Sequence, residues 1–121
     1  MRKAFALLAI AMMPTGCGRA ADTPAKPPAA FGICAACHAV APGVTLVGPS
    51  LAGVYGTRAG AVPGYAFSYA LKSSGLVLDD AGLDRWLANP VAVVPGTKMG
   101  YAGQSDPAKR RAIIAYLKTL K

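Results

Sequence analysis

The chain has 121 residues, enough for one domain of ordinary size. It is 54% hydrophobic and 15% charged, carries a formal net charge of +8, and contains no Glu. This basic balance fits an acidic protein partner or a generally solvated surface. Nucleic acid is excluded as a partner, because no basic run has aromatic residues interleaved in it and no nucleic-acid-binding module is recognisable.

Residues 1–16 have the pattern of an export signal. Arg2 and Lys3 form a charged start, and an apolar run extends from Ala4 to Met13. This run is shorter than the roughly 20 residues that a membrane-spanning helix needs, but it suits the apolar region of a signal peptide. We therefore expect export to the periplasm.

Two processing reactions are open for Cys17. Thr15–Cys17 resembles the end of a bacterial lipoprotein signal, although Pro14 stands where an aliphatic residue is usual. Ordinary cleavage near Ala20 or Ala21 would instead remove the cysteine. The position of a lone Cys directly after the apolar run favours lipidation, which would anchor the protein to a membrane.

Residues 17–29 form an Ala/Pro-rich segment with almost no bulky apolar side chain. Such a segment cannot bury a face, so the composition predicts a semi-extended tether. The folded domain is expected over 30–121, beginning with a short helix that runs from about Pro27–Ala30 into the next motif.

Cys34, Cys37 and His38 form the motif C-x-x-C-H, which is the attachment sequence for a c-type haem. Each thiol can form a thioether with one haem vinyl group, and the imidazole can supply an axial ligand to the iron. A thioredoxin-like redox pair or half of a zinc site are the alternatives. A closed zinc site needs about four protein ligands, which three Cys and one His cannot supply cleanly when one Cys lies near a processing site.

The middle of the chain alternates loops with short helices. Glycine and proline predict loops over 47–56 and 58–64, and a short helix is expected over 66–73. Asp79 is a good N-cap for a helix over about 80–88 that ends at Asn89-Pro90. Its apolar face would consist of Leu83, Trp86 and Leu87.

Residues 95–103 contain Met99 in the sequence P-G-T-K-M. Every other methionine lies at or before position 13, so Met99 is the only one outside the signal. It sits in a Gly/Pro loop rather than on an apolar helix face, which favours a ligand role over core packing. Asp106 and Pro107 then begin a helix to about Leu120, with an apolar stripe of Ile113, Ile114, Leu117 and Leu120.

These motifs together resemble the class I c-type cytochromes of the mitochondrial and alphaproteobacterial kind. The resemblance covers roughly residues 30–121 and implies a small all-α cytochrome c fold, with several short helices and loops wrapped around one covalent haem c. It implies that His38 and Met99 are the axial iron ligands, and that the Pro49 carbonyl accepts a hydrogen bond from His38. The further haem-pocket residues that it implies are Leu51, Tyr65, Trp86, Thr97 and Tyr101.

The chain departs from well-known members of this family around the haem propionates. Phe67, Leu71 and Leu78 stand where those members have Tyr, Asn and Trp, and the usual Arg is shifted by one position to Arg58. The propionates would therefore have fewer obvious partners. Lys98 is expected to be solvated and available to a partner.

The expected function is one-electron transport by a periplasmic monomer. Its partners would be a quinol–cytochrome c oxidoreductase, a terminal oxidase or another periplasmic reductase. Two alternatives stay open at this point: a dedicated electron-donor subunit of an oxidoreductase, or a haem peroxidase if Met99 dissociates. The first alternative changes only the partner, and the second makes the protein an enzyme.

Overall fold

The computed structural model describes residues 25–121, so the signal, Cys17 and most of the tether lie outside the described residues. In chain order the elements are the 3-10 turn η1 (Ala29–Phe31), α1 (Gly32–Ala35), α2 (Tyr69–Ser73), α3 (Asp80–Ala88), α4 (Pro90–Val93) and α5 (Pro107–Leu117). No strand occurs over 25–121; Arg58 and Val77 form one isolated antiparallel pairing. The fold is all-α, as predicted.

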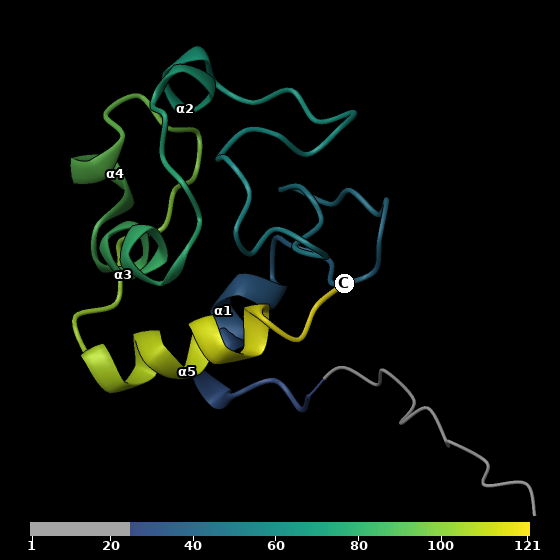
Figure 1. The fold of residues 1–121 in the computed structure, drawn as a ribbon, viewed down its shortest axis with the longest axis vertical. Coiled ribbons are helices and arrows are strands. Elements are labelled where there is room, and N and C mark those ends of the chain that lie inside the picture. Colours follow the sequence, from purple (N-terminus) through teal and green to yellow (C-terminus); the bar gives the residue numbers. More distant parts are fainter. Residues whose placement is uncertain (1–24) are drawn as a thin grey trace, which may run out of the picture.

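Helix α5 lies against both the start and the middle of the domain (Figure 1). It packs on α3 and on η1, and α3 also packs on α4. The Phe31 and Tyr116 rings meet edge to face, with centroids 4.7 Å apart. This contact joins the first and last elements of the domain, and each of its side chains is at most 6% exposed.

The predicted apolar faces form the core. Leu83, Trp86 and Leu87 of α3 are all buried, which confirms the predicted face of that helix. The predicted stripe of the last helix is buried too, and it consists of Ile113, Ile114, Leu117 and Leu120. Burial of these side chains holds α3 and α5 together through the hydrophobic effect.

The predicted caps are present. The Asp79 carboxylate accepts a hydrogen bond from the Gly82 backbone N–H at 2.8 Å, and Asp106 accepts one from Ala108 at 2.8 Å. Pro107 occupies the first turn of α5, where its missing N–H costs nothing. These local signals fix where α3 and α5 begin.

Two helix boundaries differ from the prediction, and one short helix was not predicted. The helix expected over 66–73 begins only at Tyr69, because Ser68 is extended and its hydroxyl accepts from the Leu71 N–H at 3.1 Å. Asn89-Pro90 ends α3, but Pro90 also begins α4, with the Asn89 side chain capping Ala92. The last helix ends at Leu117, and the chain turns beyond it.

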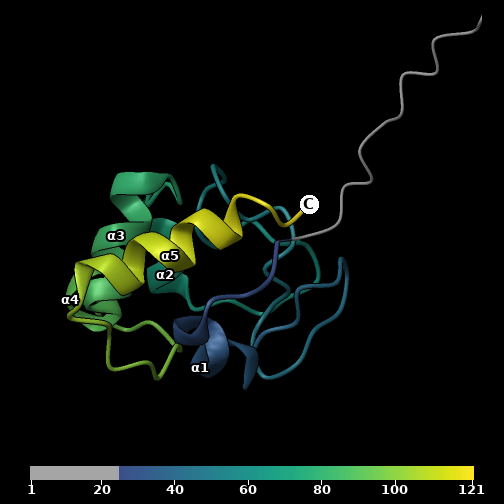
Figure 2. The ribbon, with the colours of Figure 1, turned by 90° about the horizontal axis from the view of Figure 1, so that it is seen from below.

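Residues 36–68 contain no helix and fold as consecutive turns and loops. Figures 1 and 2 show this part of the chain, after α1, on the opposite side of the domain from α3 and α4. None of the helices in the described part of the chain is long and apolar enough to cross a membrane.

Candidate haem-binding site

The C-x-x-C-H motif lies at the end of α1 and in the turn that follows. The Cys37 and His38 backbone N–H groups both donate to the Cys34 carbonyl, at 3.1 and 2.9 Å. Both cysteines are free thiols and half-buried. Burial raises the pKa of the Cys34 thiol above its usual value.

His38 is held by a backbone carbonyl from the next loop. Its Nδ1 atom lies 2.8 Å from the Pro49 carbonyl oxygen, so Nδ1 carries the proton in the neutral ring and donates it. Nε2 is then the nitrogen with a lone pair for a metal. The hydrogen bond that the resemblance implied is therefore present.

Gly48 brings the loop close enough for this hydrogen bond. A Cβ at this position would overlap three atoms of the His38 imidazole ring. The Gly48 N–H also donates to the Cys37 carbonyl at 2.8 Å. Only glycine fits here without displacing the imidazole. Sequence reasoning missed Gly48, although it directly precedes the predicted pocket residue Pro49.

The donor set suits a covalent haem better than the alternative sites. Over residues 25–121, no three His, Cys, Asp or Glu side chains gather into a group that could hold a metal ion. The strand–helix alternation of a thioredoxin-like fold is also missing from this part of the chain. Two adjacent free thiols and an oriented imidazole fit the two vinyl groups and the iron of one haem.

Met99 lies in the loop between α4 and α5. Its side chain is half-buried and packs against the core. The Met99 N–H donates to the Thr97 hydroxyl at 3.2 Å. The Lys98 ammonium donates to the Ala66 carbonyl at 2.9 Å, so the lysine that was expected to be simply solvated ties this loop to the 65–67 segment.

The other end of the methionine loop is anchored on α3 and α5. The Gln104 N–H donates to the Leu87 carbonyl at 2.8 Å, and a Cβ at Gly103 would overlap the Ala88 carbonyl. The Arg110 guanidinium donates to Gln104 O at 2.8 Å, to Ser105 O at 2.9 Å and to Asp84 at 2.7 Å. Sequence reasoning missed Arg110, because a single Arg in a basic helix gives no distinguishing signal.

The remaining predicted pocket residues lie in different environments. Trp86 is buried, and Leu51 packs half-buried against the core. The Tyr65 hydroxyl donates to the Val47 carbonyl at 3.0 Å. The pKa of Tyr101 is raised, first by burial and then by the nearby Cys34. Tyr101 of the methionine loop therefore lies near enough to Cys34 for their charges to interact.

Arg58, the candidate partner for a propionate, is exposed. Leu71 and Leu78, which replace the Asn and Trp of well-known family members, pack half-buried against the core. This part of the domain is therefore apolar, in keeping with the departures seen in the sequence.

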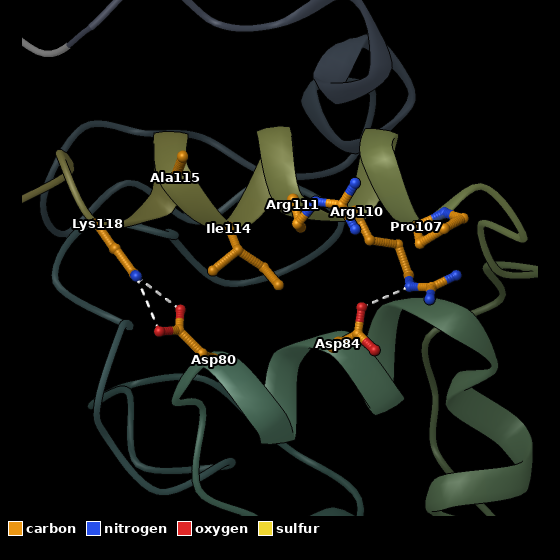
Figure 3. A pocket seen from close by; sticks show the side chains of 8 residues that line it. All are labelled: Asp80, Asp84, Pro107, Arg110, Arg111, Ile114, Ala115 and Lys118. Atoms are coloured by element: carbon orange, nitrogen blue, oxygen red, sulfur yellow. Dashed lines mark hydrogen bonds and ion pairs between the residues drawn. The ribbon is translucent and has the colours of Figure 1, made fainter.

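A separate groove of about 460 Å³ lies between α3 and α5 (Figure 3). Two ion pairs bridge it, Arg110 with Asp84 and Lys118 with Asp80, each at 2.7 Å. These four charged side chains are thus satisfied by one another. The groove joins two helices and contains none of the predicted haem ligands.

Comparison with known proteins adds to this geometry. No family model matches the chain. Cytochrome c2 iso-2 of Magnetospirillum fulvum is 52% identical over 96 residues, which cover 79% of this chain and 100% of that relative. Cytochrome c2 of Rhodopila globiformis is 52% identical over 89 residues, which cover 74% of this chain and 84% of that relative. The chain is a class I c-type cytochrome.

A solved structure agrees with this assignment. Cytochrome cH from Methylobacterium extorquens matches with a TM-score of 0.70 and 56% sequence identity, over 74% of this cytochrome and 91% of that chain. Membership of the family means that the cytochrome carries one covalently bound haem c. It transfers electrons with other redox proteins and is not an enzyme.

Proposed function

We propose that the cytochrome is a periplasmic one-electron carrier whose haem iron is ligated by His38 and Met99. When bound, the haem supplies an Fe(III)/Fe(II) couple. The observation that carries the proposal is the 2.8 Å hydrogen bond from His38 Nδ1 to Pro49 O, because it orients the imidazole and leaves Nε2 for the iron. Cys34 and Cys37 would form the two thioethers.

Three features support Met99 as the second ligand. Its thioether is the only one outside residues 1–13, and a thioether suits haem iron opposite a histidine. The Thr97 hydroxyl accepts a hydrogen bond from the Met99 N–H, and the Lys98 ammonium ties the preceding residue to the Ala66 carbonyl. Its half-buried position would help to exclude water from the iron. Two protein ligands would leave no open coordination position, as electron transport without substrate binding requires.

The further pocket roles are proposed from position. Trp86, Leu51 and Tyr101 would line the haem with apolar surface, and the Thr97 hydroxyl would keep the Met99 backbone in place. The Tyr65 hydroxyl donates to the Val47 carbonyl, and this hydrogen bond joins the two loops. The Tyr65 ring would then contribute to the haem pocket.

The partners would be membrane or periplasmic respiratory complexes, such as a quinol–cytochrome c oxidoreductase and a terminal oxidase. The domain boundaries in the proposal are 1–16 for the signal, 17–29 for the tether and 30–121 for the cytochrome domain. The comparisons give no support to a lipid on Cys17, so the proposal does not include one. Mass spectrometry of the mature N-terminus tests this: an acylated Cys17 would restore the anchor, and a start at or after Ala21 would exclude it.

The ligation is tested by optical spectroscopy of the protein expressed with c-type maturation. We expect sharp low-spin bands after reduction and a weak far-red sulfur-to-iron band in the oxidised state. Met99→Leu should abolish the far-red band and lower the reduction potential, because the soft thioether is lost. Tyr101→Phe, a change of similar size in the same loop, should keep the band.

Other spectra would contradict the proposal. Covalent haem without the far-red band in the wild type would show that Met99 is not bound, and would reopen the peroxidase alternative. Ready binding of cyanide or azide would point the same way, because it requires an accessible iron position.

A further inference from the structure

The surface beside the haem attachment turn is apolar and exposed. Over the described residues 25–121, five of the eight exposed large hydrophobic side chains lie between positions 33 and 47. They are Ile33 at 61%, Val40 at 37%, Val44 at 42%, Leu46 at 52% and Val47 at 75% exposure, and we call them the apolar strip. Exposed apolar side chains concentrated in this way mark an interaction surface.

The strip is attached to the haem-binding residues by covalent and hydrogen bonds. Ile33 directly precedes Cys34, and Val47 directly precedes Gly48, whose N–H donates to the Cys37 carbonyl at 2.8 Å. The Leu46 N–H donates to the Gly48 carbonyl at 3.1 Å. The strip therefore borders the attachment turn, and the loop after α1 that carries four of its five residues lies on the side of the domain opposite α3 and α4 (Figures 1 and 2).

Charge is absent from this part of the chain. Between Lys26 and Arg58 the sequence contains no Lys, Arg, Asp or Glu. Lys98 is linked to the edge of the strip. Its ammonium donates to the Ala66 carbonyl, and the hydroxyl of the neighbouring Tyr65 donates to the Val47 carbonyl. The net charge of +8 that suggested an acidic partner thus arises outside the strip.

We propose that the apolar strip is the docking surface for the redox partners of this carrier, and that these partners present an uncharged, apolar face to it. The inference rests on the proposed function. Electron transfer falls steeply with distance, so a partner must dock close to the haem. A charged partner face would lose its hydration against the strip and find no opposite charge there, whereas an apolar face gains from burial.

A second copy of this chain is a probe with the required face, so electron self-exchange tests the inference. One reduced copy gives one electron to one oxidised copy, and NMR line broadening in mixtures of the two gives the rate. For the wild type we expect a rate that rises with salt only as far as the general repulsion between two cationic copies is screened, a rise that the control variant Tyr69→Lys should share.

Charge placed in the strip should change this behaviour. Ile33→Lys and Val47→Lys should each lower the rate about tenfold at 0.01 M salt, with recovery at 0.5 M, because like charges then meet in the encounter. Tyr69→Lys is the matched control: Tyr69 is 83% exposed on α2, and the rate should stay within about twofold of the wild type. Val47→Thr should lower the rate equally at both salt concentrations.

The results separate the inference from the proposed function. If the oxidised protein lacks the far-red band, or if the two oxidation states do not exchange electrons, the proposed function fails. If exchange occurs but the strip variants show the same rate and the same salt dependence as Tyr69→Lys, only the docking inference is overturned. Binding of the wild type, but not of Val47→Lys, to phosphatidylcholine vesicles would also overturn it, by assigning the strip to a membrane.

Discussion

The contact between Gly48 and His38 is the tightest requirement on a single residue at the proposed site. We expect Gly48→Ala to destabilise the protein by about 2 kcal/mol, because the added methyl overlaps the imidazole in a closely packed position. The displaced ring would also weaken its bond to Pro49 O, so part of the iron should become high-spin. Chemical denaturation and the optical spectrum measure the two effects.

Gly32→Ala provides the control for this substitution. A Cβ at Gly32 meets nothing within 4 Å, and the residue is helical, so alanine should be neutral or slightly stabilising. Equal effects of the two substitutions would contradict the assigned role of Gly48.

At the scale of elements, Arg110 connects α5, α3 and the end of the methionine loop. Its side chain is 13% exposed and makes three hydrogen bonds, two to loop carbonyls and one to Asp84. Arg110→Met should cost about 2–3 kcal/mol in unfolding free energy, because it leaves these acceptors unsatisfied. If Met99 is the ligand, the far-red band should also disappear at a lower denaturant concentration than in the wild type.

Two further variants sharpen this test. Arg111→Met removes an exposed cation from the same helix and should change neither quantity appreciably. Arg110→Lys should recover little, because a lysine ammonium cannot reproduce the geometry of the guanidinium fork. Full recovery with lysine would show that only the charge of Arg110 matters.

Lys118 forms a second connection between α5 and α3, and this one depends on pH. The hydrogen bond to Asp80 raises the pKa of Lys118, and the ammonium also lies 5.1 Å from the Tyr55 ring centroid. A raised folded-state pKa stabilises the fold below the unfolded value of 10.5, and the contribution disappears as the pH rises through the folded pKa. The group is exposed, so the effect is small.

The measurement compares thermal unfolding of the wild type and Lys118→Met across pH. The variant should have a slightly lower midpoint at pH 7–9, and the difference should vanish above the pKa of the lysine. Lys109→Met, at an exposed position of the same helix, should show no such pH-dependent difference. A difference that persisted at high pH would assign the effect to the alkyl chain of Lys118.

For the molecule as a whole, we expect the haem to stabilise residues 36–68, of which only some, such as Val54 and Ala59, pack into the core. This segment has no helix, and a loop of such length is rarely stable unless it packs on something. The domain is also small, so its core alone is marginal. We expect the variant Cys34→Ser/Cys37→Ser, produced without covalent haem, to lose amide protection first over 36–68.

Hydrogen exchange with residue resolution measures this loss. Amides of α3 and α5 should keep part of their protection, because their mutual packing involves Leu83, Leu87, Ile113 and Leu117 rather than the attachment turn. Uniform protection across the whole domain would show that the loops are stable without the haem.

The sequence predicted the features that depend on short-range chemistry. Asp79 and Asp106 act as caps because a carboxylate reaches the N–H groups of the next turn without help from the rest of the fold. Apolar side chains at helical spacing identified the buried faces of α3 and α5, and C-x-x-C-H identified the cofactor. The predicted start of α2 was three residues too early, because Ser68 is the N-cap of the helix and not part of it.

The features that the sequence did not reveal require contacts between distant residues. Arg110 reaches Asp84 across 26 positions, and Lys98 reaches Ala66 across 32, so neither bond leaves a local pattern. In the sequence, the residues of the apolar strip cannot be distinguished from core residues. The structure shows that they are exposed beside the attachment turn. By itself the sequence determined the starts of α3 and α5, their core-facing side chains and the haem motif, because local backbone geometry and covalent chemistry govern these. Only the tertiary structure decided which loops are tied together and which apolar side chains stay outside, because both depend on how the whole chain packs.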